Sequence, residues 1–215
     1  MGTCPNSIYN RCSIFSSIYW WLFLIFFWIY SLHTNDKALP TFIKFKTMVE
    51  NQFSFRIQCL QSDNGGKFKR FTPYLTTHRI KHRCSCPYTL KQNNRAEQKM
   101  RHLVETSLAL LATTSLPLQF CLCAFHTATY LINWLPTKVL QFQSPFQVLF
   151  NKIPNYRHLK VFGYLCYSYL CPYNKHKLCY RYSSCMFLSY NPNHKGYLCS
   201  DSNFNCIYHS TCKSP

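Results

Sequence analysis

Apolar residues recur every three or four positions in two stretches of the chain, which is the spacing of an amphipathic helix. The first stretch follows Pro40, which stands where a first helical position would be. The second stretch, 93–113, has the strongest helical pattern in the chain. The residues at helical spacing are Phe42, Phe45, Met48, Val49 and Gln52/Phe53 in the first stretch and Met100, Leu103, Val104, Ser107, Leu108 and Leu111 in the second.

Shorter runs between these helices have the composition of β-strands. Residues 56–61 predict a strand with Ile57 and Cys59 on one face, and residues 80–84 predict another strand. Apolar residues at helical spacing predict a short helix over 68–78 between them. The order strand, helix, strand, helix favours an α/β layer fold.

The stretch 18–32, which begins at Ile18 and ends at Leu32, is the most hydrophobic part of the chain and contains no charge. It falls just short of the roughly 20 apolar residues that a membrane-spanning helix needs. Arg11 precedes it, so a signal anchor is one interpretation. Its aromatic and β-branched residues fit a pair of buried strands equally well, and both interpretations stay open.

The charge of the chain indicates a polyanionic partner. Twenty-four lysines and arginines stand against six carboxylates, which gives a formal net charge of +18. DNA or RNA is the usual partner of such an excess, and an anionic membrane surface is the second. A solvated basic surface without a partner is the remaining interpretation.

The fourteen cysteines do not form a metal-binding pattern of the usual kind, because no Cys-x-x-Cys pair occurs. The best zinc candidate is the set His78, His82, Cys84 and Cys86. Cys84 and Cys86 would point to the same side of a strand, without the turn that normally wraps the ion. Reduced and mostly buried thiols are therefore the favoured interpretation.

Two of the six carboxylates stand where a divalent-metal site would place them. Asp63 closes the strand-like run and opens an Asn-Gly-Gly turn, and Glu97 lies near the start of the long helix. An acid at the end of a strand and another on a neighbouring helix can converge on Mg²⁺ or Mn²⁺. Each has an ordinary structural alternative, since Asp63 could serve its turn and Glu97 could complete a capping box with Asn94.

Five blocks of sequence resemble the integrase region of copia-type LTR-retrotransposon polyproteins, in the same order and at similar spacing. They are LQSDNGGKF (60–68), SCPYTLKQNNRAEQKMRH (85–102), YLINWLPT (130–137), SPFQVLF (144–150) and HLKVFGYLCY (158–167). The resemblance runs from about Phe27 to the end of the chain. It implies an RNase H-like mixed sheet with flanking helices over 34–150, incomplete at its N-terminal side. It also implies a small SH3-like β-barrel over 157–215, with 1–33 as a divergent hydrophobic segment.

The resemblance also implies roles for single residues. Asp63 matches the second and Glu97 the third acid of a triad that binds Mg²⁺ or Mn²⁺ for 3′-end processing and strand transfer. Asn93 matches the asparagine of a turn near the metal, and Lys99 and Arg101 continue a basic helix face that would grip DNA phosphates. Two further bases expected to bind nucleic acid are Lys91, just before this helix, and Arg95, within it.

The chain departs from the family pattern at the first acid. That residue is expected at about Trp21, where the chain reads Trp-Leu-Phe-Leu-Ile, so the hydrophobic stretch has a third interpretation as altered coding text. Thirty-three residues separate Asp63 from Glu97, two fewer than in the family. Three further changes are Lys67 for the family's Glu, Leu90 for its Pro and Asn94 for its Gly.

We therefore expect an integrase-like protein of a retrotransposon Pol polyprotein that has lost catalytic activity. The resemblance implies DNA as partner, both retroelement ends and target DNA, together with self-association and a nuclear location. One alternative is a DNA-binding remnant without catalysis. The other is a basic protein anchored to a membrane through the stretch from Ile18 to Leu32.

Overall fold

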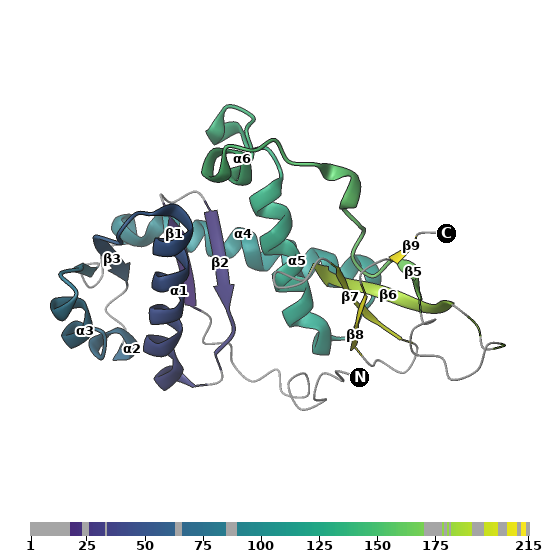
Figure 1. Ribbon diagram of the computed structural model, residues 1–215, viewed down its shortest axis with the longest axis horizontal. Coiled ribbons are helices and arrows are strands. Elements are labelled where there is room, and N and C mark those ends of the chain that lie inside the picture. Colours follow the sequence, from purple (N-terminus) through teal and green to yellow (C-terminus); the bar gives the residue numbers. More distant parts are fainter. Residues whose placement is uncertain are drawn as a thin grey trace. The chain divides into compact units, whose positions relative to one another are not determined.

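The computed structural model describes residues 18–22, 26–32, 34–62, 66–84, 90–169, 178, 180, 182–190, 196–201, 206–209 and 212–213. The chain divides into two compact units (Figure 1). One consists of Ile14–Tyr19 and Ile29–His102, and the other of Met1–Ser13, Trp20–Trp28 and Leu103–Pro215. We call them the α/β unit and the C-terminal unit.

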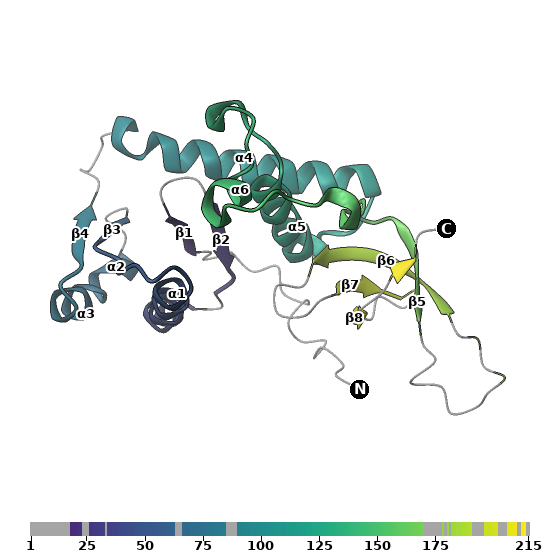
Figure 2. The same ribbon diagram turned by 45° about the horizontal axis from the view of Figure 1, so that its top comes forward.

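The α/β unit is built around two parallel strands joined by short helices. Its elements are η1 (Asn35–Lys37), α1 (Ala38–Phe53), β3 (Cys59–Ser62), α2 (Gly66–Lys69), α3 (Thr72–Thr77), β4 (Lys81–Cys84) and the first half of α4 (Leu90–Thr114). Strands β3 and β4 pair in parallel, with Cys59 opposite Lys81 and Ser62 opposite Cys84. Parallel neighbours need a crossover, and α2 and α3 provide it (Figure 2). The predicted strand-helix-strand-helix order is therefore confirmed.

The core of the α/β unit forms where α1 and α3 meet. Phe42 of α1 stacks on Phe71, with ring centroids 5.5 Å apart, and both side chains are buried. Leu75 of α3 is buried as well. The predicted helix thus exists, although it begins at Ala38, and Met48 of the predicted apolar stripe is 36% exposed.

Strand β3 begins at Cys59 rather than at residue 56, where the sequence predicted its start. Leu60 and Ser62 are buried, whereas Cys59 is exposed. Ile57 precedes the strand, and its backbone N–H donates to the Glu50 carboxylate at 2.9 Å. Pairing with β4 begins only at Cys59, and the two-residue period then turns the even positions inward.

Helix α4 begins earlier than the sequence indicated. It starts at Leu90, so Asn94 lies inside the helix and cannot be its N-cap, and the capping-box interpretation of Glu97 is wrong. Asn93 is also helical, rather than part of a turn. The resemblance implies proline at 90 and glycine at 94. The leucine and asparagine of this chain instead allow the helix to extend in this direction.

The hydrophobic stretch 18–32 contains two strands. Strands β1 (Ile18–Leu22) and β2 (Phe26–Tyr30) form a two-stranded sheet of their own, which confirms the pair of strands. The expected burial is confirmed in β2 for Phe27, and the other four residues of this strand are half-buried. Among the described residues, no helix has the length and apolar character needed to cross a bilayer.

The C-terminal unit packs a helix against an antiparallel sheet. Its helical elements are the second half of α4, η2 (Leu118–Phe120), α5 (Cys121–Trp134), η3 (Lys138–Leu140), α6 (Pro145–Phe150) and η4 (Tyr156–His158). The strands are β5 (Leu165–Tyr169), β6 (Tyr182–Tyr190), β7 (Tyr197–Ser200), β8 (Cys206–His209) and β9 (Cys212–Lys213), in the order β8-β7-β6-β5-β9. The structure therefore contains a five-stranded sheet here, and its closure into an SH3-like barrel stays a prediction.

Helix α5 attaches to this sheet through β6. Thr127 donates from Oγ1 to the carbonyl oxygen of Leu188 at 2.8 Å, and both residues are buried. Tyr130 stacks on Tyr190 with ring centroids 4.0 Å apart. Burial, with the neighbouring phenols of Tyr190 and Tyr197, raises the pKa of Tyr130, so its hydroxyl stays protonated and can donate to Nε2 of His158 at 2.6 Å.

Candidate metal and nucleic-acid site

The carboxyl ends of β3 and β4 lie side by side and define the candidate site. Ser62 is the last residue of β3 and stands opposite Cys84, the last residue of β4. Asp63 follows Ser62 directly in the chain, although Asp63 itself lies outside the described residues. In open α/β folds, ligands bind beyond the carboxyl ends of parallel strands. The strand end that Asp63 follows in the sequence is an end of this kind.

One histidine connects the two strands at this edge. His82 of β4 approaches Ser62 of β3, with 2.8 Å between Nε2 and Oγ. The sulfur of Cys84 lies 3.6 Å from the same nitrogen. The Ser62–His82 contact holds the residue that directly precedes Asp63, and no sequence motif pointed to it.

The zinc hypothesis fails on His78. Its ring stacks on Tyr74 with centroids 3.9 Å apart, and Nδ1 lies 2.9 Å from the Tyr74 carbonyl oxygen one turn earlier. His78, His82 and Cys84 do not form a ligand group in the described part of the chain, and Cys86 lies outside that part. The expectation of mostly buried thiols is confirmed for five of the seven cysteines whose side chains the structure describes, while Cys59 and Cys84 are exposed.

Helix α4 carries the second acid. Glu97 is exposed on it, and Arg101, one turn further on, is exposed too. Lys99 is half-buried, and burial lowers the pKa of its ammonium group. Lys99 and Arg101 do not continue a single basic face, because two residues turn a helix by roughly 200°.

Three further predicted contacts belong to the same helix. Lys91, Asn93 and Arg95 all lie within α4, and their side chains fall outside the described part of the structure. Of the predicted phosphate-binding bases whose side chains are described, Arg101 is thus exposed and Lys99 is half-buried.

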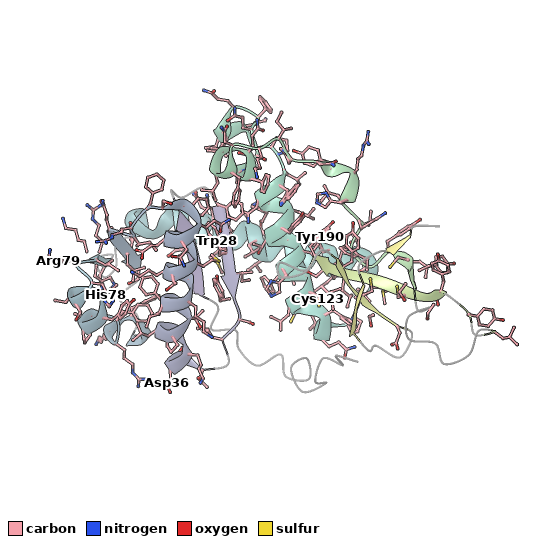
Figure 3. The ribbon with its side chains drawn as sticks, viewed as in Figure 1. Trp28, Asp36, His78, Arg79, Cys123 and Tyr190 are labelled. Carbon is pink, nitrogen blue, oxygen red and sulfur yellow. The ribbon has the colours of Figure 1, made fainter. Side chains whose placement is uncertain are left out.

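Two other acids of the α/β unit already have basic partners. Asp36, which is labelled in Figure 3, forms an ion pair with Arg70. Glu50 accepts from Lys46 at 2.7 Å and from the Ile57 amide at 2.9 Å. Both carboxylates are therefore engaged in ion pairs within the fold.

A basic surface near the site escaped the sequence reasoning. Arg79, Lys81 and Arg83 are all exposed along the end of α3 and one face of β4. The signal was the alternation of cations at every second position, which places Lys81 and Arg83 on one side of a strand. Between residues 29 and 102 the sequence has fourteen lysines and arginines and four carboxylates, so the site lies in a strongly positive unit.

The chain is 48% identical over 172 residues to the retrovirus-related Pol polyprotein from transposon RE2 of Arabidopsis thaliana, a match that covers 80% of this chain and 12% of the relative. It therefore belongs to the retrovirus-related Pol polyproteins of copia-type transposons. Identity to the polyprotein from transposon RE1 of the same plant is 46%, with the same coverage. The Nicotiana tabacum polyprotein from transposon TNT 1-94 is 36% identical over 79% of this chain and 13% of its own length.

The chain therefore spans about an eighth of these relatives. No established family profile matches it. Among solved structures, the magnesium complex of the HTLV-2 integrase catalytic core domain aligns with 62% of this chain and 92% of its own, at a TM-score of 0.44 and 14% identity. The catalytic core domain of BIV integrase aligns with 59% of this chain and 78% of its own, at a TM-score of 0.42 and 16% identity.

Proposed function

We propose that the chain is an integrase-like segment of a copia-type Pol polyprotein, with an RNase H-like core over 34–150 followed by an SH3-like barrel over 157–215. The observation that carries the proposal is the position of Asp63 directly after β3, at the carboxyl end of a parallel pair. The substrate class is DNA, both retroelement ends and target DNA. Self-association and a nuclear location belong to the same proposal.

DNA binding rests on charge and exposure. Arg79, Lys81 and Arg83 form an exposed basic edge, and Arg101 adds an exposed guanidinium on α4. Such side chains bind phosphates and do not recognise the base sequence. The proposed DNA contact is therefore mainly electrostatic, and it extends the predicted set of Lys91, Asn93, Arg95, Lys99 and Arg101 by the three bases of the edge.

Catalysis by these 215 residues alone is not part of the proposal. Two acids, Asp63 and Glu97, would supply the negative charge for Mg²⁺ or Mn²⁺. At the position where the first acid of the triad is expected, the chain has Trp21 instead. An indole cannot coordinate a hard cation, and both metals prefer several oxygen ligands in regular geometry. We therefore expect weak metal binding and no strand transfer.

DNA binding is tested by fluorescence anisotropy with a labelled duplex at a series of salt concentrations. Affinity should fall steeply between about 50 mM and about 200 mM salt, because binding releases counterions from DNA. Exchanging Arg79, Lys81 and Arg83 for glutamine should reduce the slope by roughly 0.9 for each phosphate that the variant no longer neutralises.

The matched control removes the same charge from the other unit. Lys138, Lys152 and Arg157 are exposed there, and their exchange for glutamine should leave the slope much closer to that of the natural chain. Affinity that does not change with salt, or an equal decrease in slope in both triple variants, would refute the proposed surface.

Catalysis is tested separately with a labelled donor end and plasmid target in Mg²⁺ or Mn²⁺. We expect no joined product from the natural chain. Joined product that disappears in Asp63→Asn would show that two acids suffice and would overturn the inactivity proposal, while the DNA-binding proposal would stand or fall on the salt series alone.

A further inference from the structure

Three cysteines from three neighbouring strands meet in the C-terminal unit. Cys166 belongs to β5, Cys185 to β6 and Cys199 to β7, and all three are buried. Cys166 and Cys185 stand directly opposite each other in the antiparallel pair. Their sulfurs are 3.3 Å apart, the sulfurs of Cys166 and Cys199 are 3.7 Å apart, and the three sulfurs lie within 4.8 Å of one another.

This spacing suits one shared metal ion. Two sulfurs that bind one ion at about 2.3 Å lie about 3.8 to 4.0 Å apart, depending on the angle between them. The Cys166–Cys199 separation already agrees, and the Cys166–Cys185 separation would need to open by about half an ångström. Rotation of the cysteine side chains is enough for that, since their backbone strands are already paired.

The surroundings favour a soft ion. The thiols lie in a cluster with Phe187 and Tyr190, and Tyr130 packs against it. Thiolates select soft cations, whereas Mg²⁺ and Ca²⁺ prefer oxygen. In the described part of the chain the group contains three ligands, one fewer than structural zinc sites normally use, so a thiophilic ion that accepts three sulfurs fits best.

We propose that Cys166, Cys185 and Cys199 form a trithiolate site for a soft, thiophilic d¹⁰ metal ion. Binding of a divalent ion would form three metal–sulfur bonds and release the three thiol protons to solvent. The bound site would carry one net negative charge. Because the ligands come from three successive strands, the ion would join β5, β6 and β7 and stabilise the sheet independently of the DNA surface and of Asp63.

The test uses Cd²⁺ as probe, with the full chain kept reduced by a phosphine. Uptake is followed by thiolate-to-cadmium charge-transfer absorption and by competition with a chromophoric chelator. Each single variant, Cys166→Ala, Cys185→Ala or Cys199→Ala, should bind one tight Cd²⁺ fewer per chain than the natural sequence. Proton release per chain should fall by about three at the same time, because each site needs three thiolates.

The control is a double variant at two other buried cysteines. Cys121 and Cys123 of α5 are buried but are not members of the cluster, so their exchange for alanine should leave the tight ion in place. Cd²⁺ should raise the melting temperature of the natural chain and of this control, and should have no such effect in the Cys199→Ala variant. Equal Cd²⁺ uptake and equal thermal shifts in the cluster variants and the natural chain would overturn the proposal.

Discussion

The side chain of Asn133 forms two hydrogen bonds with the backbone of Phe27, which lies 106 positions earlier in the chain. Its Oδ1 accepts from the Phe27 N–H at 2.9 Å, and its Nδ2 donates to the Phe27 carbonyl oxygen at 2.8 Å. Both residues are buried. The side-chain amide thus pairs with a backbone N–H and a backbone carbonyl oxygen of β2, as a neighbouring strand would do. It also joins this strand to α5.

Asn133→Leu should destabilise the C-terminal unit. The leucine has nearly the same volume but leaves a donor and an acceptor of Phe27 buried without these partners, at a cost of about 2–4 kcal/mol. Asn133→Asp should be worse, because it keeps an acceptor and places a negative charge beside the Phe27 carbonyl oxygen. Urea unfolding measures both. Asn51→Leu, at an exposed position of α1, is the control, and an equal loss of stability there would contradict this role for Asn133.

At Gly163, the addition of a single Cβ atom should lower the stability of the fold. Its φ is +72°, and an added Cβ would lie 2.4 Å from Cγ2 and 2.7 Å from Cβ of Thr114. Gly163→Ala should therefore cost about 2–4 kcal/mol through backbone strain and overlap together.

The matched variant is Gly66→Ala, where nothing lies within 4 Å of an added Cβ. Alanine at this α2 position should be neutral or slightly stabilising, because it restricts the unfolded chain. Thermal unfolding of the two variants decides the matter. Similar melting temperatures for both would show that the Gly163 backbone can relax away from Thr114.

Periodicity was sufficient to predict the long elements. The stripe through Phe42, Phe45 and Val49 is buried as expected, and so are Leu103 and Leu111 of α4. Leu108 is 53% exposed. Because a helix has 3.6 residues per turn, residues spaced by three and four do not all point in the same direction, and those at the margin of a stripe face solvent.

Short elements were harder to predict because their faces depend on partners far away in the chain. The register of β3 is set by β4, and the sequence of 56–61 alone does not show which residues of the strand face the interior.

The resemblance blocks were a stronger guide to family than to chemistry. Asn133 and Gly163 belong to two of them and act as structural contacts in the fold.

The strand end that precedes Asp63 was predictable from the sequence, whereas the contacts around that strand end were not. Asp63 was expected at a strand end, and β3 does end at Ser62. The Ser62–His82 contact and the exposed cations beside it depend on the parallel pairing, which no local pattern reveals. The trithiolate group joins residues up to 33 positions apart, and only the sheet brings them together.

Glu50 should make the α/β unit sensitive to acid. Burial acts to raise the pKa of its carboxyl, but hydrogen bonds from Lys46 and from the Ile57 amide, with the Lys46 charge, outweigh burial and lower that pKa below its ordinary value of 4.5. The folded state therefore holds the carboxylate more strongly than the unfolded state. The stabilisation is complete above about pH 4.5 and is lost as pH falls through the lowered pKa.

Glu50→Gln should accordingly weaken the fold at neutral pH and flatten the dependence of stability on pH below about 4.5. Urea midpoints at several pH values measure this. Glu105→Gln, at an exposed position of α4, should keep the slope of the natural chain. If Glu50→Gln leaves the acid slope unchanged, the contacts with Lys46 and Ile57 contribute nothing to the ionised form.

His126 of α5 should produce a second pH effect, in a higher range. Burial lowers the pKa of its imidazole below the ordinary value of 6.5, because the charged ring would lose its hydration. The unfolded chain therefore takes up the proton first as pH falls through about 6.5, and stability decreases from there towards the lower folded pKa.

His126→Phe should remove this decrease and flatten the stability profile between about pH 7 and about pH 5. His102→Gln, at an exposed position of α4, is the control for the loss of one histidine. Urea midpoints across this range decide, and identical slopes for the natural chain and His126→Phe would show that the ring is hydrated in the folded protein.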